Sequence, residues 1–294
     1  MIVPCKDISS FIKQDLKRRV QDLSASDSVP KLVTIHVGES KEQESYVAIK
    51  RKMADELGIV FEYIHIPKPP TLINFMKIVR EHCRNENTGI IIQQPLPPRL
   101  QSDTIYNFIP LLKEIEGHKN KSPFMPPLGL AILTILKYVF VKNEIGPHLY
   151  PDQEEDSQIF KTLFKTKKVV LLGRGQTGGL PIGNTLTAYK INYINVNSQT
   201  PNPTEYISQA DVVITAAGKK IITPDMLKPG ATLLNVGLHQ EGKKLIGDYD
   251  ERKIKNVAGW YTQTPGGLGP IDVLYLFKNL VDAAHLSVHA RNKK

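Results

Sequence analysis

Apolar and polar residues alternate in the first half of the chain in blocks that predict helices and strands in turn. An amphipathic helix is predicted near the N-terminus from the apolar face formed by Ile8, Phe11, Ile12, Leu16 and Leu23. Further helices are predicted at 43–57 and 72–82, and strands at 31–37, 59–66 and 89–93. This alternation is typical of an α/β fold, in which helices cover a parallel sheet.

The second half repeats the alternation after a proline-rich segment at 123–128, which we expect to be a hinge. An apolar helix is predicted at 129–141, and residues 143–165 are expected to form mainly a surface connection. The later strands are predicted at 168–172, 191–196, 211–215 and 231–236, with a short one near 256–259. We therefore expect a first α/β domain over 1–128, with a C-terminal helix 270–294 packing back on it, and a Rossmann-type domain over 129–269.

A glycine-rich turn, Gly173-Arg174-Gly175-Gln176-Thr177-Gly178-Gly179, lies between an apolar strand and a helix-like stretch. Glycines allow a sharp turn and let backbone N–H groups approach a pyrophosphate, while the helix N-terminus adds partial positive charge. The context favours a dinucleotide site, although a purely structural glycine turn has the same pattern.

The second strand of this domain bears on which dinucleotide is bound. NAD sites usually carry an acid about 20 residues beyond the glycines, whereas here the strand leads to Asn197-Ser198-Gln199-Thr200. Arg174 and the hydroxyls of Ser198 and Thr200 suit a 2′-phosphate, so NADP is preferred over NAD. The alternative is that Arg174 is a solvent-facing turn residue.

Four polar side chains in the first half are candidates for chemistry. Tyr46 and Lys50 share one helix face, and a lysine beside an aromatic ring in a cleft can act as an acid or base. Gln93 ends a buried strand, and Glu116 could bind the N–H groups of a heterocycle in pairs. For Tyr46 and Lys50 the alternative is a solvated helix face. Gln93 could instead fix the proline loop that follows it, and Glu116 could lie in a solvated acidic loop. The glycine-rich loop 264–270 could approach a flat ligand or be a plain turn.

Composition narrows these possibilities. The chain has 294 residues, is 41% hydrophobic and carries a formal net charge of +9. Its basic residues are scattered, so we expect no nucleic acid partner, and no apolar run approaches the roughly 20 residues of a membrane span. Cys5 and Cys83 predict neither a disulfide framework nor a metal site. Without a signal pattern in the first ten residues, a cytoplasmic location is expected.

Five segments, taken in order, resemble the methylenetetrahydrofolate dehydrogenase/cyclohydrolase family along nearly the whole chain. They are Ser45 to Lys52, Gly89 to Pro97, Gly173-Arg174 with Gly179 and Pro181, Ala210 to Lys219, and Pro265 to Pro270. The alternative of a short-chain dehydrogenase is disfavoured, because in that class the glycine turn precedes the Tyr/Lys pair.

The resemblance implies a folate cleft between two α/β domains, NADP on the C-terminal domain, and homodimers acting in one-carbon metabolism and purine biosynthesis. It implies that Lys50 is the central acid/base group, that Gln93 orients it and that Tyr46 stacks on the folate. Glu116 stands where the family has its folate-binding aspartate. The implied substrate residues are Tyr46, Gln93, Leu96, Glu116, Pro265, Gly266 and Gly267. The implied cofactor residues are Gly173, Arg174, Gly175, Gly178, Gly179, Ser198, Thr200, Ala217, Gly218, Gly237 and Asp272.

The implied reaction oxidises 5,10-methylenetetrahydrofolate with NADP and then hydrolyses the methenyl product to 10-formyltetrahydrofolate. Several residues depart from the family pattern: Glu116, Met125-Pro126-Pro127, Gly175, Asn235, Thr264 and Asp272, beside a shortened stretch from Gly117 to Pro123. These departures leave open an enzyme with one of the two activities, or a non-catalytic folate-binding relative.

Overall fold

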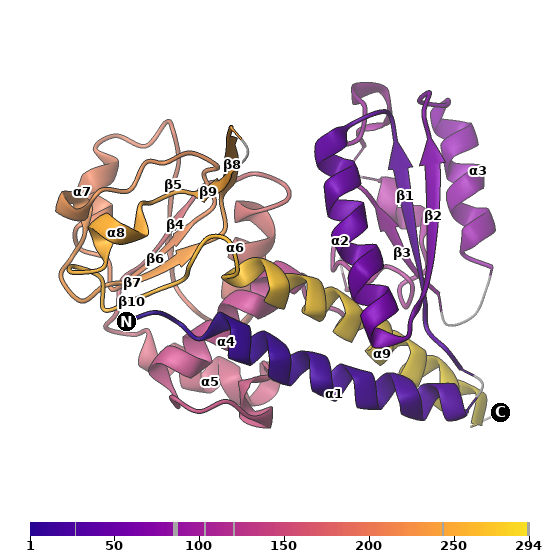
Figure 1. Cartoon of the computed structure of the whole chain (residues 1–294), viewed down its shortest axis with the longest axis horizontal. Coiled ribbons are helices and arrows are strands. Elements are labelled where there is room, and N and C mark those ends of the chain that lie inside the picture. Colours follow the sequence, from indigo (N-terminus) through magenta and orange to yellow (C-terminus); the bar gives the residue numbers. More distant parts are fainter. Residues whose placement is uncertain (27, 85–87, 103, 120, 243, 293–294) are drawn as a thin grey trace. The chain divides into compact units, whose positions relative to one another are not determined.

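A computed structural model describes residues 1–26, 28–84, 88–102, 104–119, 121–242 and 244–292 (Figure 1). The chain divides into two compact units. Unit 1 contains Met1–Phe11 and Leu128–Asp272, and unit 2 contains Ile12–Pro127 and Val273–Lys294. Helices α1 (Cys5–Ala25) and α9 (Leu268–Asn292) each supply residues to both units. Residues 1–11, which we expected in the first domain, are therefore grouped with the glycine-rich half of the chain.

Unit 2 is built on a parallel sheet of order β2-β1-β3, formed by β1 (Lys31–Val37), β2 (Val60–Ile66) and β3 (Thr88–Ile92). Figure 1 shows α2 (Lys41–Leu57) and α3 (Leu72–His82) on opposite sides of this sheet. The predicted strands and helices of this half are thus confirmed to within a few residues. Short 3-10 helices lie at Pro98–Leu100 and Ile105–Phe108.

Local sequence explains why α2 begins and ends where it does. The Ser40 side chain accepts a hydrogen bond from the Gln43 N–H, which satisfies a free donor of the first turn. Gly58 ends the helix in the left-handed conformation, with φ of 76°. Between these caps, Val47, Ala54 and Leu57 are buried. The helix is therefore held by one apolar face, and its remaining faces are available to polar residues.

Unit 1 contains a parallel sheet of order β10-β7-β6-β4-β5. Its strands are β4 (Val169–Leu172), β5 (Ile194–Val196), β6 (Val212–Thr215), β7 (Thr232–Asn235) and β10 (Trp260–Tyr261). An antiparallel hairpin, β8 (Leu238–Glu241) and β9 (Lys244–Gly247), follows β7. The helices are α4 (Pro127–Phe140), α5 (Gln153–Leu163), α6 (Gly179–Ala188), α7 (Pro203–Ile207) and α8 (Glu251–Ile254), with 3-10 turns at Pro147–Leu149 and Pro224–Met226. Figure 1 shows α6 on one side of the sheet and α7 and α8 on the other.

The prediction for 143–165 as mainly a surface connection was wrong, because α5 occupies its second half. The Asp152 side chain caps α5 by accepting the N–H groups of Glu154 and Glu155. Asp156, which lies in the middle of this segment, is 2% exposed, and its carboxylate lies 2.7 Å from Lys137 Nζ. The ion pair with Lys137, 19 residues earlier in the chain, thus allows an acid of this polar segment to be buried.

Two further differences concern unit 1. The last strand lies at Trp260–Tyr261 and not near 256–259, where Ala258 instead packs in a buried cluster with Val213, Leu233 and Tyr261. The β8–β9 hairpin was not predicted. In the part of the chain that the structure describes, no helix is long and apolar enough to cross a membrane, and no group of three or more metal-binding side chains is assembled.

Candidate functional site

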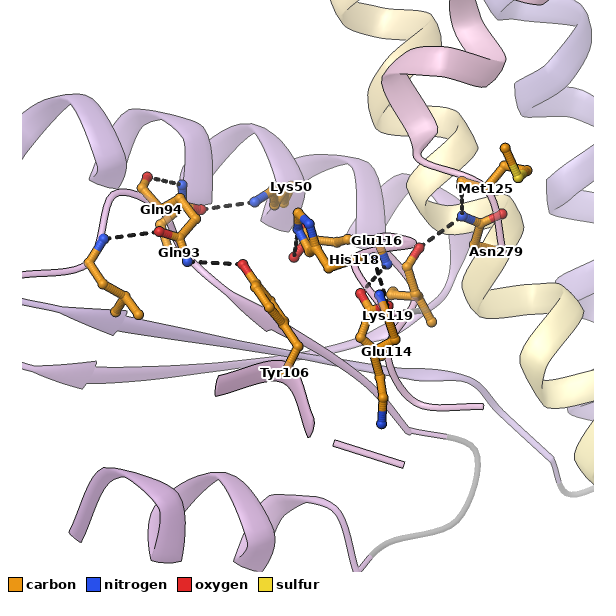
Figure 2. Close-up of polar contacts among 12 residues, drawn as sticks. Lys50, Gln93, Gln94, Tyr106, Glu114, Glu116, His118, Lys119, Met125 and Asn279 are labelled. Atoms are coloured by element: carbon orange, nitrogen blue, oxygen red, sulfur yellow. Dashed lines mark hydrogen bonds and ion pairs between the residues drawn. The ribbon is translucent and has the colours of Figure 1, made fainter. Parts of the chain in front are cut away.

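Lys50 and Gln93 meet in unit 2, at the carboxyl end of β3 (Figure 2). The Lys50 Nζ donates a hydrogen bond to Gln93 Oε1 at 2.9 Å. Gln93 itself is 8% exposed, and its backbone N–H donates to Ile35 O on the central strand at 2.9 Å. Its side-chain Nε2 donates to Gln94 O at 3.1 Å, which fixes the orientation of the amide. The sheet therefore presents a fixed acceptor to an amine carried by α2.

Tyr46 lies one turn before Lys50 on α2 and is 40% exposed. Because residues four apart lie on the same side of a helix, the phenol ring and the amine share one face. Lys50 lies three residues after Val47 and four before Ala54, so the amine emerges from the buried side of the helix, with Tyr46 at its edge. An exposed ring beside an amine is suited to contact with a flat, polar ligand.

The loop after β3 brings a carboxylate toward the same amine. Glu114 is 1% exposed, and its side chain accepts the backbone N–H groups of Glu116, His118 and Lys119 at 3.0, 2.9 and 3.3 Å. Burial and the neighbouring charge of Glu116 raise the pKa of Glu114. Of the two acids in this loop, Glu114 is thus occupied by the backbone, and Glu116 is the one that offers its carboxylate.

The charge of Glu116 depends on pH near neutrality. Burial raises the pKa of Glu116 to about 7 from its ordinary value of 4.5, and the positive charge of Lys50 partly opposes this rise. The side chain retains 22% exposure, so a ligand can reach it. Lys50, Gln93 and Glu116, which the sequence placed in three separate segments, are thus gathered in unit 2.

Two aromatic residues beside Glu116 were missed by the sequence analysis. His118 Nε2 lies 3.8 Å from Glu116 Oε2, a distance that makes an ion pair only when the imidazole is protonated. Burial lowers the pKa of His118, and the charge of Glu114 partly opposes this effect. The His118 ring stacks on Tyr106 with centroids 4.2 Å apart, and the Tyr106 hydroxyl accepts from Gln94 Nε2 at 2.9 Å. The available signal was the position of His118 directly after the Glu116-Gly117 pair.

Asn279 on α9 was also missed. It is 3% exposed, and its Nδ2 donates to Ile115 O at 2.8 Å and to Met125 O at 3.0 Å (Figure 2). These two acceptors flank the shortened stretch after Glu116. One amide from the C-terminal helix therefore fastens both ends of the loop that carries the candidate carboxylate.

Leu96 is placed differently from the other predicted substrate residues. Its side chain is 3% exposed and packs in the core cluster with Ile92, Leu100 and Ile105. Its backbone N–H donates to Gln94 Oε1, and its carbonyl accepts from Gln101 Nε2. These contacts show Leu96 as a packing residue that helps to shape the loop after Gln93.

The glycine turn of unit 1 has the geometry that the sequence predicted. Gly173 has φ of +109°, and a Cβ there would lie 2.5 Å from Ala216 O. A Cβ on Gly179, the first residue of α6, would lie 2.2 Å from Gly173 O. Only glycine fits at either position, so the N-terminus of α6 approaches the end of β4 closely. This is the arrangement of a dinucleotide phosphate site.

Arg174 projects from this turn toward the loop after β5. Its Nη2 donates to Gln199 Oε1 at 3.2 Å. In that loop the Asn197 N–H donates to Thr200 Oγ1 at 3.0 Å, and the Gln199 N–H donates to Asn197 Oδ1 at 2.9 Å. Arg174 and the segment with Ser198 and Thr200 therefore lie next to each other, with no acid in the segment.

The other predicted residues of unit 1 follow strand ends. Ala217 and Gly218 come after β6, Gly237 comes after β7, and the loop with Pro265, Gly266 and Gly267 follows β10. In a parallel sheet the carboxyl ends of the strands share one edge, where ligands bind. The three loop residues at 265–267, grouped in the sequence analysis with the substrate, thus belong to the same unit as the cofactor residues. Asp272 lies on α9 near its start.

Comparison with known proteins divides the chain in a similar way, but it places residues 3–11 with the catalytic domain and residues 273–288 with the NAD(P)-binding domain. Residues 3–116 match the family described as "Tetrahydrofolate dehydrogenase/cyclohydrolase, catalytic domain", and residues 158–288 match its "NAD(P)-binding domain". The "Bifunctional protein FolD" of Moorella thermoacetica is 31% identical over 286 residues, covering 96% of this chain and 98% of that protein. The chain belongs to the tetrahydrofolate dehydrogenase/cyclohydrolase family.

Solved structures of the family have the same fold. The bifunctional enzyme FolD from Campylobacter jejuni superposes with a TM-score of 0.84 at 25% identity, covering 97% of this chain and 99% of that one. The enzyme of Trypanosoma brucei, solved with NADP and an inhibitor, superposes with a TM-score of 0.82 at 24% identity, covering 98% of each chain.

Two departures from the family pattern are in contact in this structure. Asn235 Nδ2 donates to Thr264 Oγ1 at 2.9 Å, and also to Gly237 O at 2.9 Å. An aspartate at 235 would have no hydrogen to donate to either oxygen. The asparagine and the threonine, which differ from the usual aspartate and valine, therefore form one hydrogen-bonded pair.

Proposed function

We propose that this protein is a bifunctional enzyme, an NADP-dependent 5,10-methylenetetrahydrofolate dehydrogenase and a 5,10-methenyltetrahydrofolate cyclohydrolase. The observation that carries the proposal is the hydrogen bond of 2.9 Å from Lys50 Nζ to Gln93 Oε1, within the segment that matches the family's catalytic domain. NADP, when bound to unit 1, supplies the acceptor for the hydride that leaves the methylene carbon. The glycine turn and Arg174 fit that cofactor, because the turn admits a pyrophosphate and the guanidinium pairs with a 2′-phosphate.

In the proposed hydrolysis, Lys50 handles the protons. Water adds to the methenyl carbon and loses a proton, the bond from that carbon to one ring nitrogen breaks, and that nitrogen gains a proton. The products are 10-formyltetrahydrofolate and one released proton. An amine held by a neutral amide acceptor can take a proton from water and return it to nitrogen. The cationic substrate favours the neutral amine by like-charge repulsion.

Glu116 and Tyr46 are proposed to hold the folate. An ionised carboxylate accepts two N–H donors of a pterin ring in a paired arrangement, and the exposed Tyr46 ring offers a stacking surface. Because paired donors favour the ionised form of Glu116, folate binding is expected to lower the pKa of this group and to release a proton near pH 7.

The test follows methenyl absorbance after the protein is mixed with methylenetetrahydrofolate and NADP. Formation of the methenyl species followed by accelerated decay supports both activities. Accumulation without accelerated decay would leave the dehydrogenase alone, and no signal with NADP or NAD despite folate binding would leave a binding protein. Lys50→Met is expected to abolish hydrolysis, whereas Lys52→Met, an exposed lysine on the same helix, is the matched control. Normal hydrolysis by Lys50→Met would remove Lys50 from the mechanism.

We also propose a homodimer located in the cytoplasm, contributing one-carbon units to purine biosynthesis, with no nucleic acid partner. The family resemblance supports the first three statements, and the unpaired Cys5 and Cys83 suit a reducing compartment. Basic side chains that pair with acids, as Lys13 does with Glu56 and Arg19 with Asp282, support the last. Sedimentation of the purified protein tests the dimer, and a mobility-shift titration with RNA and DNA tests the last statement.

A further inference from the structure

Asp248, which the sequence analysis did not single out, lies at the centre of a hydrogen-bond network in unit 1. The residue directly follows β9 and is 0% exposed. Its Oδ2 accepts from the Thr215 hydroxyl and from the Ala217 N–H, the latter at 2.9 Å. Its Oδ1 accepts from the Lys219 N–H at 2.9 Å. One buried carboxylate thus binds both ends of the turn that follows β6.

The backbone of Asp248 extends the network to two more strand ends. Its N–H donates to Asn235 Oδ1 at 2.7 Å, at the end of β7. Asn235 in turn donates to Thr264 Oγ1, in the loop after β10. The turns after β6, β7 and β10 are therefore joined through two side chains, which we call the Asp248–Asn235 pair.

The backbone packs closely against the side chains of the Asp248–Asn235 pair. A Cβ on Gly237 would lie 2.2 Å from Asp248 Oδ2, and a Cβ on Gly247 would lie 2.7 Å from Asn235 Nδ2. The turn after β6 is also in contact with the glycine turn, because a Cβ on Gly173 would lie 2.5 Å from Ala216 O. A shift of the segment 216–219 would consequently reach the predicted phosphate site.

We propose that Asp248 is a positioning residue for NADP, and that the Asp248–Asn235 pair holds the turns after β6, β7 and β10 in the conformation that receives the dinucleotide. This inference rests on the proposed dehydrogenase function. It assigns to these two residues a role in cofactor affinity and none in proton transfer. The turns concerned contain Ala217, Gly218 and Gly237, which were predicted to contact the cofactor.

The decisive variant is Asp248→Asn. An amide of the same shape must turn its NH2 group toward the Ala217 N–H or toward the Lys219 N–H, so that two donors face each other whichever way it lies. We expect the Kd and KM for NADP to rise about tenfold or more, because a buried N–H is then left without an acceptor. Cyclohydrolase kcat, which is measured at saturating methenyltetrahydrofolate without NADP, is expected to stay within about twofold, because Lys50 and Gln93, the residues proposed for proton transfer, lie in unit 2.

The matched control is Asp156→Asn, which changes a buried carboxylate of the same unit that contacts Lys137 and the Asp152 N–H instead of the strand ends. We expect it to lower Tm without changing the Kd for NADP. If both variants weaken NADP binding equally, or if Asp248→Asn binds NADP as the parent does, the proposal is overturned. If instead the parent chain shows no dehydrogenase activity, it is the proposed function that fails.

Thr215→Val keeps the test decisive if Asp248→Asn does not fold. This variant removes one of the three donors to the carboxylate and leaves both backbone N–H groups in place. We expect a rise of about threefold in the Kd for NADP, with hydrolysis unchanged. An unchanged Kd for NADP in Thr215→Val would contradict the positioning role.

Discussion

Replacing Glu116 by Gln removes a carboxyl group whose pKa of about 7 makes its charge vary in the physiological range. In the free protein the ionised form is unfavourable, because the surrounding protein withholds water from the charge. An amide has nearly the same shape and carries no charge. We therefore expect Glu116→Gln to be more stable than the parent chain at pH 8, and to have about the same stability near pH 4.5.

The size of the effect follows from the rise in pKa. A change from 4.5 to about 7 corresponds to about 3 kcal/mol, at about 1.4 kcal/mol for each unit of pKa. Because 22% of the side chain remains exposed, we reduce the expected gain to about 2 kcal/mol. The folded protein holds this proton more tightly than the unfolded chain does. The contribution of Glu116 to the unfolding free energy of the parent therefore falls as pH rises from about 4.5 to about 7 and then levels off.

Urea unfolding of both proteins at several pH values between about 4.5 and 8 measures this difference. Glu56→Gln is the control, because Glu56 accepts from Lys13 Nζ at 2.6 Å and the pKa of its carboxyl is lowered by that contact. Removing the charge of Glu56 is expected to give a small loss of stability above its pKa, which is the opposite sign. A Glu116→Gln curve that runs parallel to the parent curve over the whole range would refute the reasoning.

Three further predictions concern cofactor and folate binding. Arg174→Ala is expected to weaken NADP binding about tenfold more than NAD binding, because only NADP carries the 2′-phosphate; equal losses in titrations with the two cofactors would exclude that contact. Gly179→Val is expected to abolish NADP binding and to lower Tm, because its Cβ would lie 2.2 Å from Gly173 O. Normal NADP binding by a folded Gly179→Val would contradict this close approach. Asn279→Leu leaves the carbonyls of Ile115 and Met125 without their donor, so folate Kd should rise about tenfold and the unfolding free energy should fall by about 2 kcal/mol. Unchanged folate binding in a destabilised Asn279→Leu would show that the amide supports folding alone.

Much of the architecture was predictable because it depends on local patterns. The strand at 31–37 and the helix at 72–82 have the bounds that the apolar spacing predicted. The turn from Gly173 to Gly179 was also recognisable, because its glycines lie directly between an apolar run and a helix-like stretch. The segment 143–165 was misread for the converse reason, because the burial of Asp156 depends on Lys137, which its local composition does not reveal.

The candidate site also has a part that the sequence predicted and a part that only the structure shows. The residue types at Lys50 and Gln93 indicated chemistry, but their distance of 2.9 Å required β3 to bring the amide beneath α2. Asn279 lies 164 positions from Ile115, and Asp248 lies 33 positions from Thr215. Their side chains are ordinary polar residues in the sequence, and only their acceptors and donors across the fold give them a role.

The amino-acid sequence by itself thus determined the order of helices and strands, the glycine turn and the family, because each of these is encoded in neighbouring residues. Only the tertiary structure decided which acid holds a loop and which faces the amine, and which buried carboxylate joins the strand ends. The physical reason is that hydrogen bonding and burial depend on distances in space, which the topology of the sheet sets between residues far apart in the chain.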